Sequence, residues 1–137
     1  MTLGKIVLCL FVAIFAGCSH APAINGNPCQ AYLNEASHVE VTTSGQVSRM
    51  FGLRAGPSGE HEGFLMRLQN CARNRFTVRV EDNTGFTGEI PLGVGDAVSL
   101  KGEYEYYPRG GVIHWTHRDP RGRHPDGYID FNGKRYQ

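Results

Sequence analysis

The sequence predicts a mainly β protein: a small closed barrel of five strands behind a short N-terminal α-helix. Apolar and polar residues alternate along several short segments, as they do in half-buried strands. Eighteen glycines and seven prolines favour short strands and turns over long helices. A chain of 137 residues corresponds to one domain, which we place at residues 27–137.

The N-terminus has the composition of an export signal. Residues 1–5 form a short, positively charged start, and residues 6–16 form an unbroken apolar run. Such a run is too short to cross a bilayer as a helix but suits the apolar region of a signal peptide. We therefore assign residues 1–17 to a signal peptide.

Small residues precede Cys18. The sequence FAGC at residues 15–18 resembles a bacterial lipobox, which implies cleavage before Cys18 and attachment of diacylglycerol to its thiol. Phe15 departs from the aliphatic residue that is usual at its position. The alternative is an ordinary secretory signal that is cleaved a few residues later.

The residues after Cys18 predict where the lipid anchor is delivered. Ser19 resembles the sorting pattern of outer-membrane lipoproteins. We expect residues 18–26 to be a tether and the protein to be lipid-anchored in the bacterial envelope, at the outer membrane and facing the periplasm. The lipid anchor makes the membrane its first predicted partner.

Two cysteines remain in the exported chain, because Cys9 leaves with the signal peptide and Cys18 carries the lipid. An even pair in an oxidising compartment predicts a disulfide between Cys29 and Cys71. Two buried free thiols are the alternative.

The overall charge gives no sign of a nucleic-acid partner. The full chain has a net charge of +1, and removal of residues 1–17, whose one charged side chain is Lys5, leaves it formally neutral. A domain that binds nucleic acid through its overall field is strongly basic.

The helix is predicted over residues 28–38, where Asn27 can cap its first turn and Pro28 suits its first position. Alternating patterns then predict a barrel over residues 39–117, with Gly45 as a bend in a long first strand. Residues 117–137 are predicted to be a C-terminal arm rich in proline and glycine. The five strands are predicted at about residues 39–51, 61–68, 76–81, 98–106 and 112–116.

The segment from Phe76 to Glu105 is similar to OB-fold proteins, in which a Gly-Asp turn often leads into the fourth strand. Here a strand and the turn DNTG at residues 82–85 precede Gly95-Asp96 and the next strand, as in small periplasmic OB-fold proteins. The resemblance implies a five-stranded Greek-key barrel whose open face binds ligands. An immunoglobulin-like sandwich is the alternative, but about 100 residues offer too few strands for it.

One stretch, GGVIHWTHRDPRGRHPDGY at residues 110–128, has the composition of a site. It holds the one tryptophan of the chain and three of the six histidines. Histidine can titrate or bind metal near neutral pH, and glycine and proline fix turns.

Residues 102–129 resemble the signature of a family of small bacterial secreted proteins and lipoproteins. That family is marked by an HWTH motif and is named only as a domain of unknown function. The similarity covers about residues 41–136 and includes His61, whereas Glu62 and Tyr128 stand where the family has an amide residue and a tryptophan. The resemblance implies a fold and a site but no activity.

A divalent metal such as zinc is the one cofactor that the sequence suggests, because imidazole and carboxylate groups suit it. Residues three apart on a regular strand point to opposite faces, so His114 and His117 can share an ion only if the chain bends after Trp115. The candidate metal ligands are His61, His114, His117, Asp119 and His124, with Asp126 as a further carboxylate.

Ligand binding is the leading hypothesis for the same region. Aromatic rings can stack on a sugar or a base beside guanidinium groups. The expected ligand is an anionic glycan, a peptide, a nucleotide or a small ion of the envelope. The candidate binding residues are His61, Arg67, Tyr104, Tyr106, Trp115, Arg118, Arg121 and Arg123.

Two alternatives stand beside ligand binding. The first is a metal-dependent hydrolase of the phosphodiesterase or nuclease kind, with a histidine base and arginines that grip phosphate. The second is a purely structural role, in which Trp115 fills the core and Asp119 caps the turn at residues 119–122. We expect an exported, lipid-anchored and non-catalytic binding module.

Overall fold

The computed structural model describes residues 26–69, 71 and 76–137. The predicted signal peptide, Cys18 with its predicted lipid and residues 19–25 of the predicted tether lie outside the described residues. Within the described part, no helix has the length and apolar character needed to cross a membrane.

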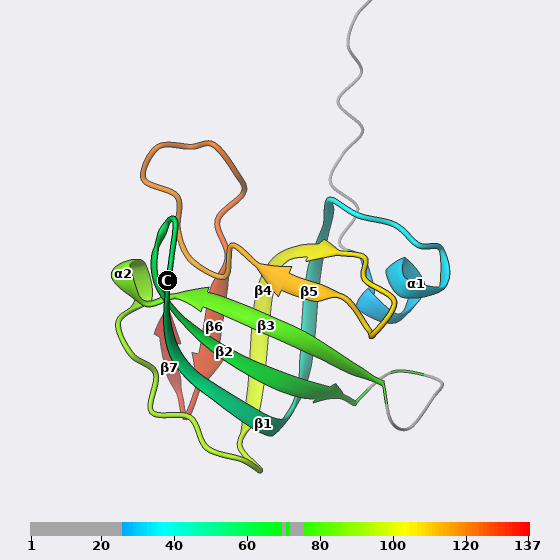
Figure 1. Ribbon diagram of the computed structural model, residues 1–137, viewed down its shortest axis with the longest axis horizontal. Coiled ribbons are helices and arrows are strands. Elements are labelled where there is room, and N and C mark those ends of the chain that lie inside the picture. The colour runs from blue at the N-terminus through cyan, green and yellow to red at the C-terminus, as the bar shows by residue number, and fades with distance from the viewer. Residues whose placement is uncertain (1–25, 70, 72–75) are drawn as a thin grey trace, which may run out of the picture.

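The fold is mainly β and is built on one sheet of seven strands with two short helices. The strand order is β1-β2-β3-β5-β4-β6-β7, and β1 also pairs with β4. Five strands therefore close into a ring, and β6 and β7 extend the sheet beside β4 (Figure 1). The strands are β1 (Val39–Gly56), β2 (Gly59–Leu68), β3 (Thr77–Asn83), β4 (Ala97–Glu105), β5 (Val112–His114), β6 (Tyr128–Phe131) and β7 (Lys134–Tyr136).

The long strand β1 closes the ring because it serves two neighbours. Its first half pairs antiparallel with β4, and its second half pairs antiparallel with β2. The predicted bend at Gly45 falls where the two pairings meet. A Cβ atom at Gly45 would collide with the carbonyl oxygen of Arg67, so the two strands can approach this closely only at a glycine.

The interior of the ring is filled by every second residue of its strands. Phe64 and Met66 are fully buried and Leu68 is nearly so, as their alternation predicted. Tyr104 is also fully buried, and its hydroxyl donates to the carbonyl oxygen of Gly110 at 3.1 Å. Tyr104 is therefore a core residue and not part of an exposed ligand face, which corrects its prediction as a binding residue.

The N-terminal helix α1 (Pro28–Leu33) is shorter than the predicted span of residues 28–38. It begins as predicted, because the side chain of Asn27 accepts a hydrogen bond from the amide of Cys29 at 2.8 Å. It ends early because Glu35 adopts a left-handed backbone, with φ of 51°, and His38 does so again with φ of 59°. His38 therefore lies beyond the helix, directly before β1.

Two strands were missed within the predicted C-terminal arm. Strands β6 and β7 form a hairpin, and β6 pairs antiparallel with β4. Asn132 and Gly133 make its turn with φ of 49° and 76°, the conformation that an Asn-Gly pair favours in a two-residue hairpin. The arm proper is therefore limited to residues 117–127.

A second short helix was also missed. The predicted turn at residues 82–85 leads into α2 (Thr84–Thr87), which Asn83 caps by accepting a hydrogen bond from the amide of Gly85 at 3.0 Å. This helix places Phe86 beside the arm.

The structure pairs Cys29 with Cys71 as a disulfide, with Cα atoms 5.8 Å apart. That separation is typical of disulfides. The bond joins α1 to the segment that follows β2.

Candidate functional site

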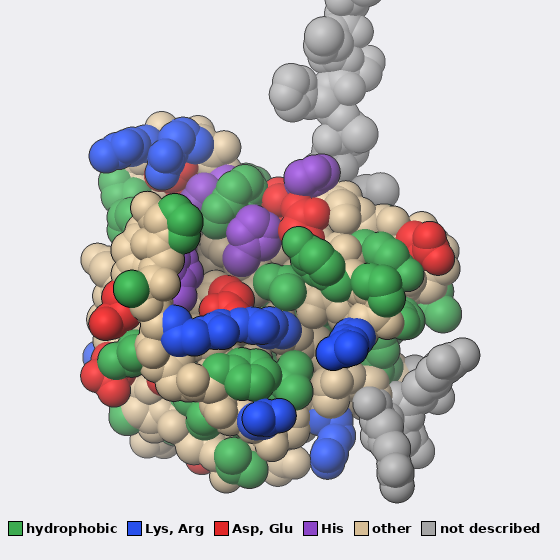
Figure 2. All heavy atoms as spheres, viewed as in Figure 1, with side chains coloured by type: hydrophobic (Ala, Val, Ile, Leu, Met, Phe, Trp, Pro, Cys, Tyr) green, Lys and Arg blue, Asp and Glu red, His purple; other side chains and the backbone are tan. Residues whose placement is uncertain are grey.

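One face of the ring is hollowed into a groove of about 1140 Å³. In Figure 1 the arm, drawn in orange, rises above the sheet beside the tip of the β1–β2 hairpin, and residues of both line the groove. Figure 2 shows histidine side chains gathered in the hollow, with Lys and Arg side chains on two sides of it. The predicted residues that line it are His61, His114, Trp115, His117, Arg121, Arg123 and His124.

The chain bends at Trp115, the bend that His114 and His117 would need in order to share an ion. Trp115 has a left-handed backbone with φ of 53°, which is uncommon for a residue other than glycine. After this bend the regular alternation of the strand ends, and the arm carries His124 back onto Trp115. The indole and the His124 imidazole stack with centroids 4.5 Å apart and planes 7° apart.

The rings continue as a row along the groove. The His117 imidazole stacks on Phe86 with centroids 4.3 Å apart and meets the edge of His124 at 5.1 Å. At the other end, His114 lies 4.7 Å from Trp115. Five rings from β5, Trp115, the arm and α2 therefore form one continuous row, in which His117 and the side chain of His124 are buried, at 5% and 3% exposed.

Asp119 holds the arm in shape and does not face the groove. Its carboxylate, with a side chain only 1% exposed, accepts hydrogen bonds from the amides of Arg121, Arg123 and His124. Burial alone would raise the pKa of Asp119, but these hydrogen bonds and the charge of Arg123 lower it to about 2. The structural role of Asp119 was the alternative to its prediction as a metal ligand.

The arm closes on itself at Gly127. The amide of Gly127 donates to the carbonyl oxygen of His117 at 2.9 Å, and the amide of Asp119 donates to the carboxylate of Asp126 at 3.0 Å. A side chain at Gly127 would collide with the backbone of Trp115, so glycine is required where the arm returns to the sheet.

Three of the groove histidines share one orientation. The Nδ1 atoms of His117 and His124 each lie 2.8 Å from a backbone carbonyl oxygen, and that of His61 lies 3.0 Å from another. A carbonyl oxygen only accepts, so each Nδ1 carries the hydrogen and each Nε2 keeps its lone pair when the ring is neutral.

A buried carboxylate anchors the floor of the groove. Asp82 is fully buried and accepts hydrogen bonds from Thr116, at 2.6 Å, and from Thr87. Burial raises its pKa, and the two hydroxyl donors offset part of that increase. Asp82 thereby ties the HWTH segment to α2, which brings His117 against Phe86.

The groove is more basic than the rest of the chain. Among the described residues that line it, five are arginine and two are glutamate. Arg79 and Arg49 lie over the ring of Phe51, at 4.9 and 5.3 Å from its centroid, and Arg79 also donates to Glu81. These residues of β1 and β3 were not predicted as site residues, although the alternation placed Arg79 on the polar face of its strand.

Three predicted binding residues lie apart from the groove. Arg67 is exposed on β2 and does not line it. The ring of Tyr106 packs 5.6 Å from Tyr32, on the side of α1. Arg118 is 60% exposed and lies 3.8 Å from Asp126, within the arm.

The predicted metal ligands fall into two neighbourhoods. His117 and His124 meet within the row of rings, whereas Nε2 of His114 lies 3.6 Å from Glu103 and 3.8 Å from Glu105. Within the described part of the chain, one group of three histidine or acidic side chains brings its ligand atoms within 4.8 Å of one another: His38, Glu103 and Glu105. No sequence signal pointed to that group, because His38 is far in the chain from Glu103 and Glu105.

Fold and groove together define a small, mainly β domain with a basic groove lined by aromatic and imidazole rings. The chain belongs to the family described as protein of unknown function DUF3465, whose family model matches residues 10–137. No curated protein and no solved structure matches the chain.

Proposed function

We propose that this protein is an exported, lipid-anchored envelope module that binds an anionic glycan in the groove. One observation carries the proposal: a single hollow face combines an excess of arginine with a continuous row of aromatic and imidazole rings. The anchor would be the lipid on Cys18, which would hold the domain close to envelope glycans.

An OB-like architecture supports this use of the face. The closed order β1-β2-β3-β5-β4, with β3 and β5 parallel, is the strand arrangement expected of an OB barrel. In that fold the ligand lies across the middle strands and is flanked by loops. Here the groove crosses β2 and β3 between the β1–β2 hairpin and the arm.

The side chains define the chemistry of the ligand. Guanidinium groups recognise carboxylate, sulfate or phosphate groups by paired hydrogen bonds. Phe86, Tyr107 and Trp115 line the groove and are 44%, 58% and 36% exposed, so their rings are available to stack on flat faces. A chain of acidic sugars offers both anionic groups for the arginines and flat sugar faces for the aromatic rings.

Calorimetric titration with a short oligogalacturonate tests the proposal. We expect binding that weakens as salt is raised, because the contacts are ionic. Arg121→Ala should weaken it, whereas Arg118→Ala should not, because Arg118 lies on the same arm but does not line the groove. Equal effects of the two variants, or no binding of the probe, would count against this function. Tighter binding of an oligothymidylate than of the oligogalacturonate would instead identify nucleic acid as the ligand of the groove.

Export and lipidation have their own test. Inhibition of the lipoprotein signal peptidase, or Cys18→Ser, should shift the mobility of the protein and release it from the membrane fraction. An unchanged distribution would contradict the anchor while leaving the groove proposal intact.

A metal-dependent hydrolase is the second candidate, because backbone carbonyls hold Nδ1 of His117 and His124, two imidazoles that line the groove, and no hydrogen bond occupies their Nε2 atoms among the described residues. Histidines that ligate metals are held in this way. Phosphodiester hydrolysis by the zinc-loaded protein, abolished by His117→Ala, would establish this candidate over simple binding.

A further inference from the structure

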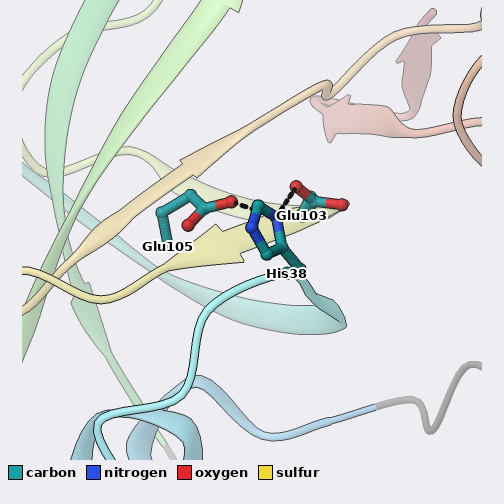
Figure 3. A group of neighbouring side chains, drawn as sticks. All are labelled: His38, Glu103 and Glu105. Atoms are coloured by element: carbon teal, nitrogen blue, oxygen red, sulfur yellow. Dashed lines mark hydrogen bonds and ion pairs between the residues drawn. The ribbon is translucent and has the colours of Figure 1, made fainter.

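Four ligand-type side chains from three separate segments meet at one wall of the groove. Glu103 and Glu105 point to the same side of β4, because the buried Tyr104 between them points inward. His114 on β5 stands directly opposite Glu103 in the strand register. His38 reaches the same place from the residue before β1, and Figure 3 shows its ring between the two carboxylates.

The distances from the two imidazoles to the carboxylates suit a shared ion, and the ligand atoms of His38, Glu103 and Glu105 all lie within 4.8 Å of one another, a group to which His114 is adjacent. His38 Nδ1 lies 3.1 Å from Oε1 of Glu103 and 2.8 Å from Oε1 of Glu105. His114 Nε2 lies 3.6 and 3.8 Å from the same two oxygens. Ligands that surround a zinc ion tetrahedrally at its usual bond lengths are about 3.4 Å from one another. The four measured separations fall on both sides of that value.

The protein alone leaves this cluster incompletely paired. Nε2 of His114 is buried and has no hydrogen-bond partner among the described residues. The side chains of Glu103 and Glu105 are only 12% and 22% exposed. The two carboxylates therefore lie close together with little water to screen their charges. A divalent cation would neutralise both carboxylates and give the orphaned nitrogen a partner.

We propose that His38, Glu103, Glu105 and His114 form a zinc site. Four protein ligands of the nitrogen and oxygen type match a closed, tetrahedral zinc centre. The ion would fix the segment between α1 and β1 to β4 and β5. Glu105 and His114 also line the groove, so the bound ion would set the charge of that wall.

The site is independent of what the groove binds, and it differs from the metal set predicted from the sequence. Only His114 is common to the two sets. His61, His117 and His124 are the internal controls, because they are imidazoles of the same groove outside the proposed centre.

Tag-free protein, stripped of metal, is to be titrated with Zn²⁺ by calorimetry and with Co²⁺ by visible absorption. We expect one equivalent of Zn²⁺ to bind and Co²⁺ to give the strong visible bands of tetrahedral coordination. Glu103→Gln and His38→Gln should each weaken Zn²⁺ binding by more than about a hundredfold, since loss of an outer-shell partner alone costs up to that much. His117→Gln should leave it unchanged.

Glu103→Gln keeps the shape of the side chain and His38 lies at the surface, and circular dichroism will show that these two variants and His117→Gln are folded. Unchanged Zn²⁺ affinity in Glu103→Gln and His38→Gln overturns the site. Loss of binding in His117→Gln places the ion in the row of rings instead. Absence of binding to the wild-type protein means that a protonated His38 alone bridges the two carboxylates, which also overturns the site.

Discussion

Replacement of Thr116 by valine tests how the groove is held together. Valine keeps the shape of threonine and removes the one hydroxyl that donates to Asp82 from the HWTH segment, at 2.6 Å. Both residues are fully buried, so water cannot replace the lost donor without opening the core. A hydrogen bond to a charged group is worth roughly 1.5–3 kcal/mol. For a domain of about 110 residues, that loss lowers the melting temperature by about 6–12 °C.

The pH dependence of the loss identifies its cause. Burial already raises the pKa of Asp82, so the ionised carboxylate costs folding stability once the pH exceeds the ordinary value of an aspartate. Without Thr116 the pKa rises further and the cost at pH 7 grows. The difference between Thr116→Val and the wild type should therefore be full at pH 7 and shrink as the pH falls through the raised pKa of Asp82 towards pH 4.

Urea denaturation at the two pH values measures this difference. Thr116→Ser is the matched control, because it keeps the hydroxyl and loses one methyl group, worth about 1 kcal/mol. The reasoning is refuted if Thr116→Val unfolds like the wild type at pH 7. It is refuted equally if the destabilisation is the same at pH 7 and pH 4.

Three further predictions concern stability. The Cys29–Cys71 bond closes a loop with a sequence separation of 42, so the double serine variant should lose about 4 kcal/mol in urea denaturation; two reactive thiols in the oxidised protein would contradict the bond. Asp119 stabilises the arm at pH values above its ordinary pKa, and this contribution should disappear as the pH falls through about 2; an NMR titration of the arm amides with a midpoint near 4 would disprove the cap. Burial raises the pKa of Glu62, which accepts a hydrogen bond from the amide of Ile90, so Glu62→Gln should keep that bond and stabilise the protein at pH 7 by less than about 1.4 kcal/mol; a gain that persists at pH 4 would point to another cause.

Local patterns predicted the parts of the fold that depend on neighbouring residues. The alternation around Phe64 and Met66 identified core positions, because residues two apart share a face of a strand. The same parity made a bend after Trp115 a condition for His114 and His117 to share an ion; the bend is present, but the two imidazoles lie in separate neighbourhoods. The β6–β7 hairpin carried a comparable signal in Asn132-Gly133, which was overlooked when the segment was interpreted as an arm.

Local patterns could not predict which residues far apart in the sequence meet in the fold. His38 and Glu103 are separated by 65 positions and meet only because β1 pairs with β4. His38 looked like the end of a helix, and the left-handed turns that carry it out of the helix depend on tertiary packing. Phe86 directly follows the turn predicted at residues 82–85, and its contact with His117 depends on the bonds of Asp82. Tyr104 and Tyr106 were predicted as stacking residues from their type alone, whereas the closed ring buries Tyr104 and Tyr106 packs against Tyr32 beside α1.

The fluorescence of Trp115 is the most direct test of the groove as a binding site. It is the one tryptophan of the chain and lines the groove, so its emission reports on this surface alone. Titration with oligogalacturonate should change the emission saturably, with a dissociation constant equal to that from calorimetry. Calorimetric binding without any change in Trp115 emission would place the ligand elsewhere and contradict the account.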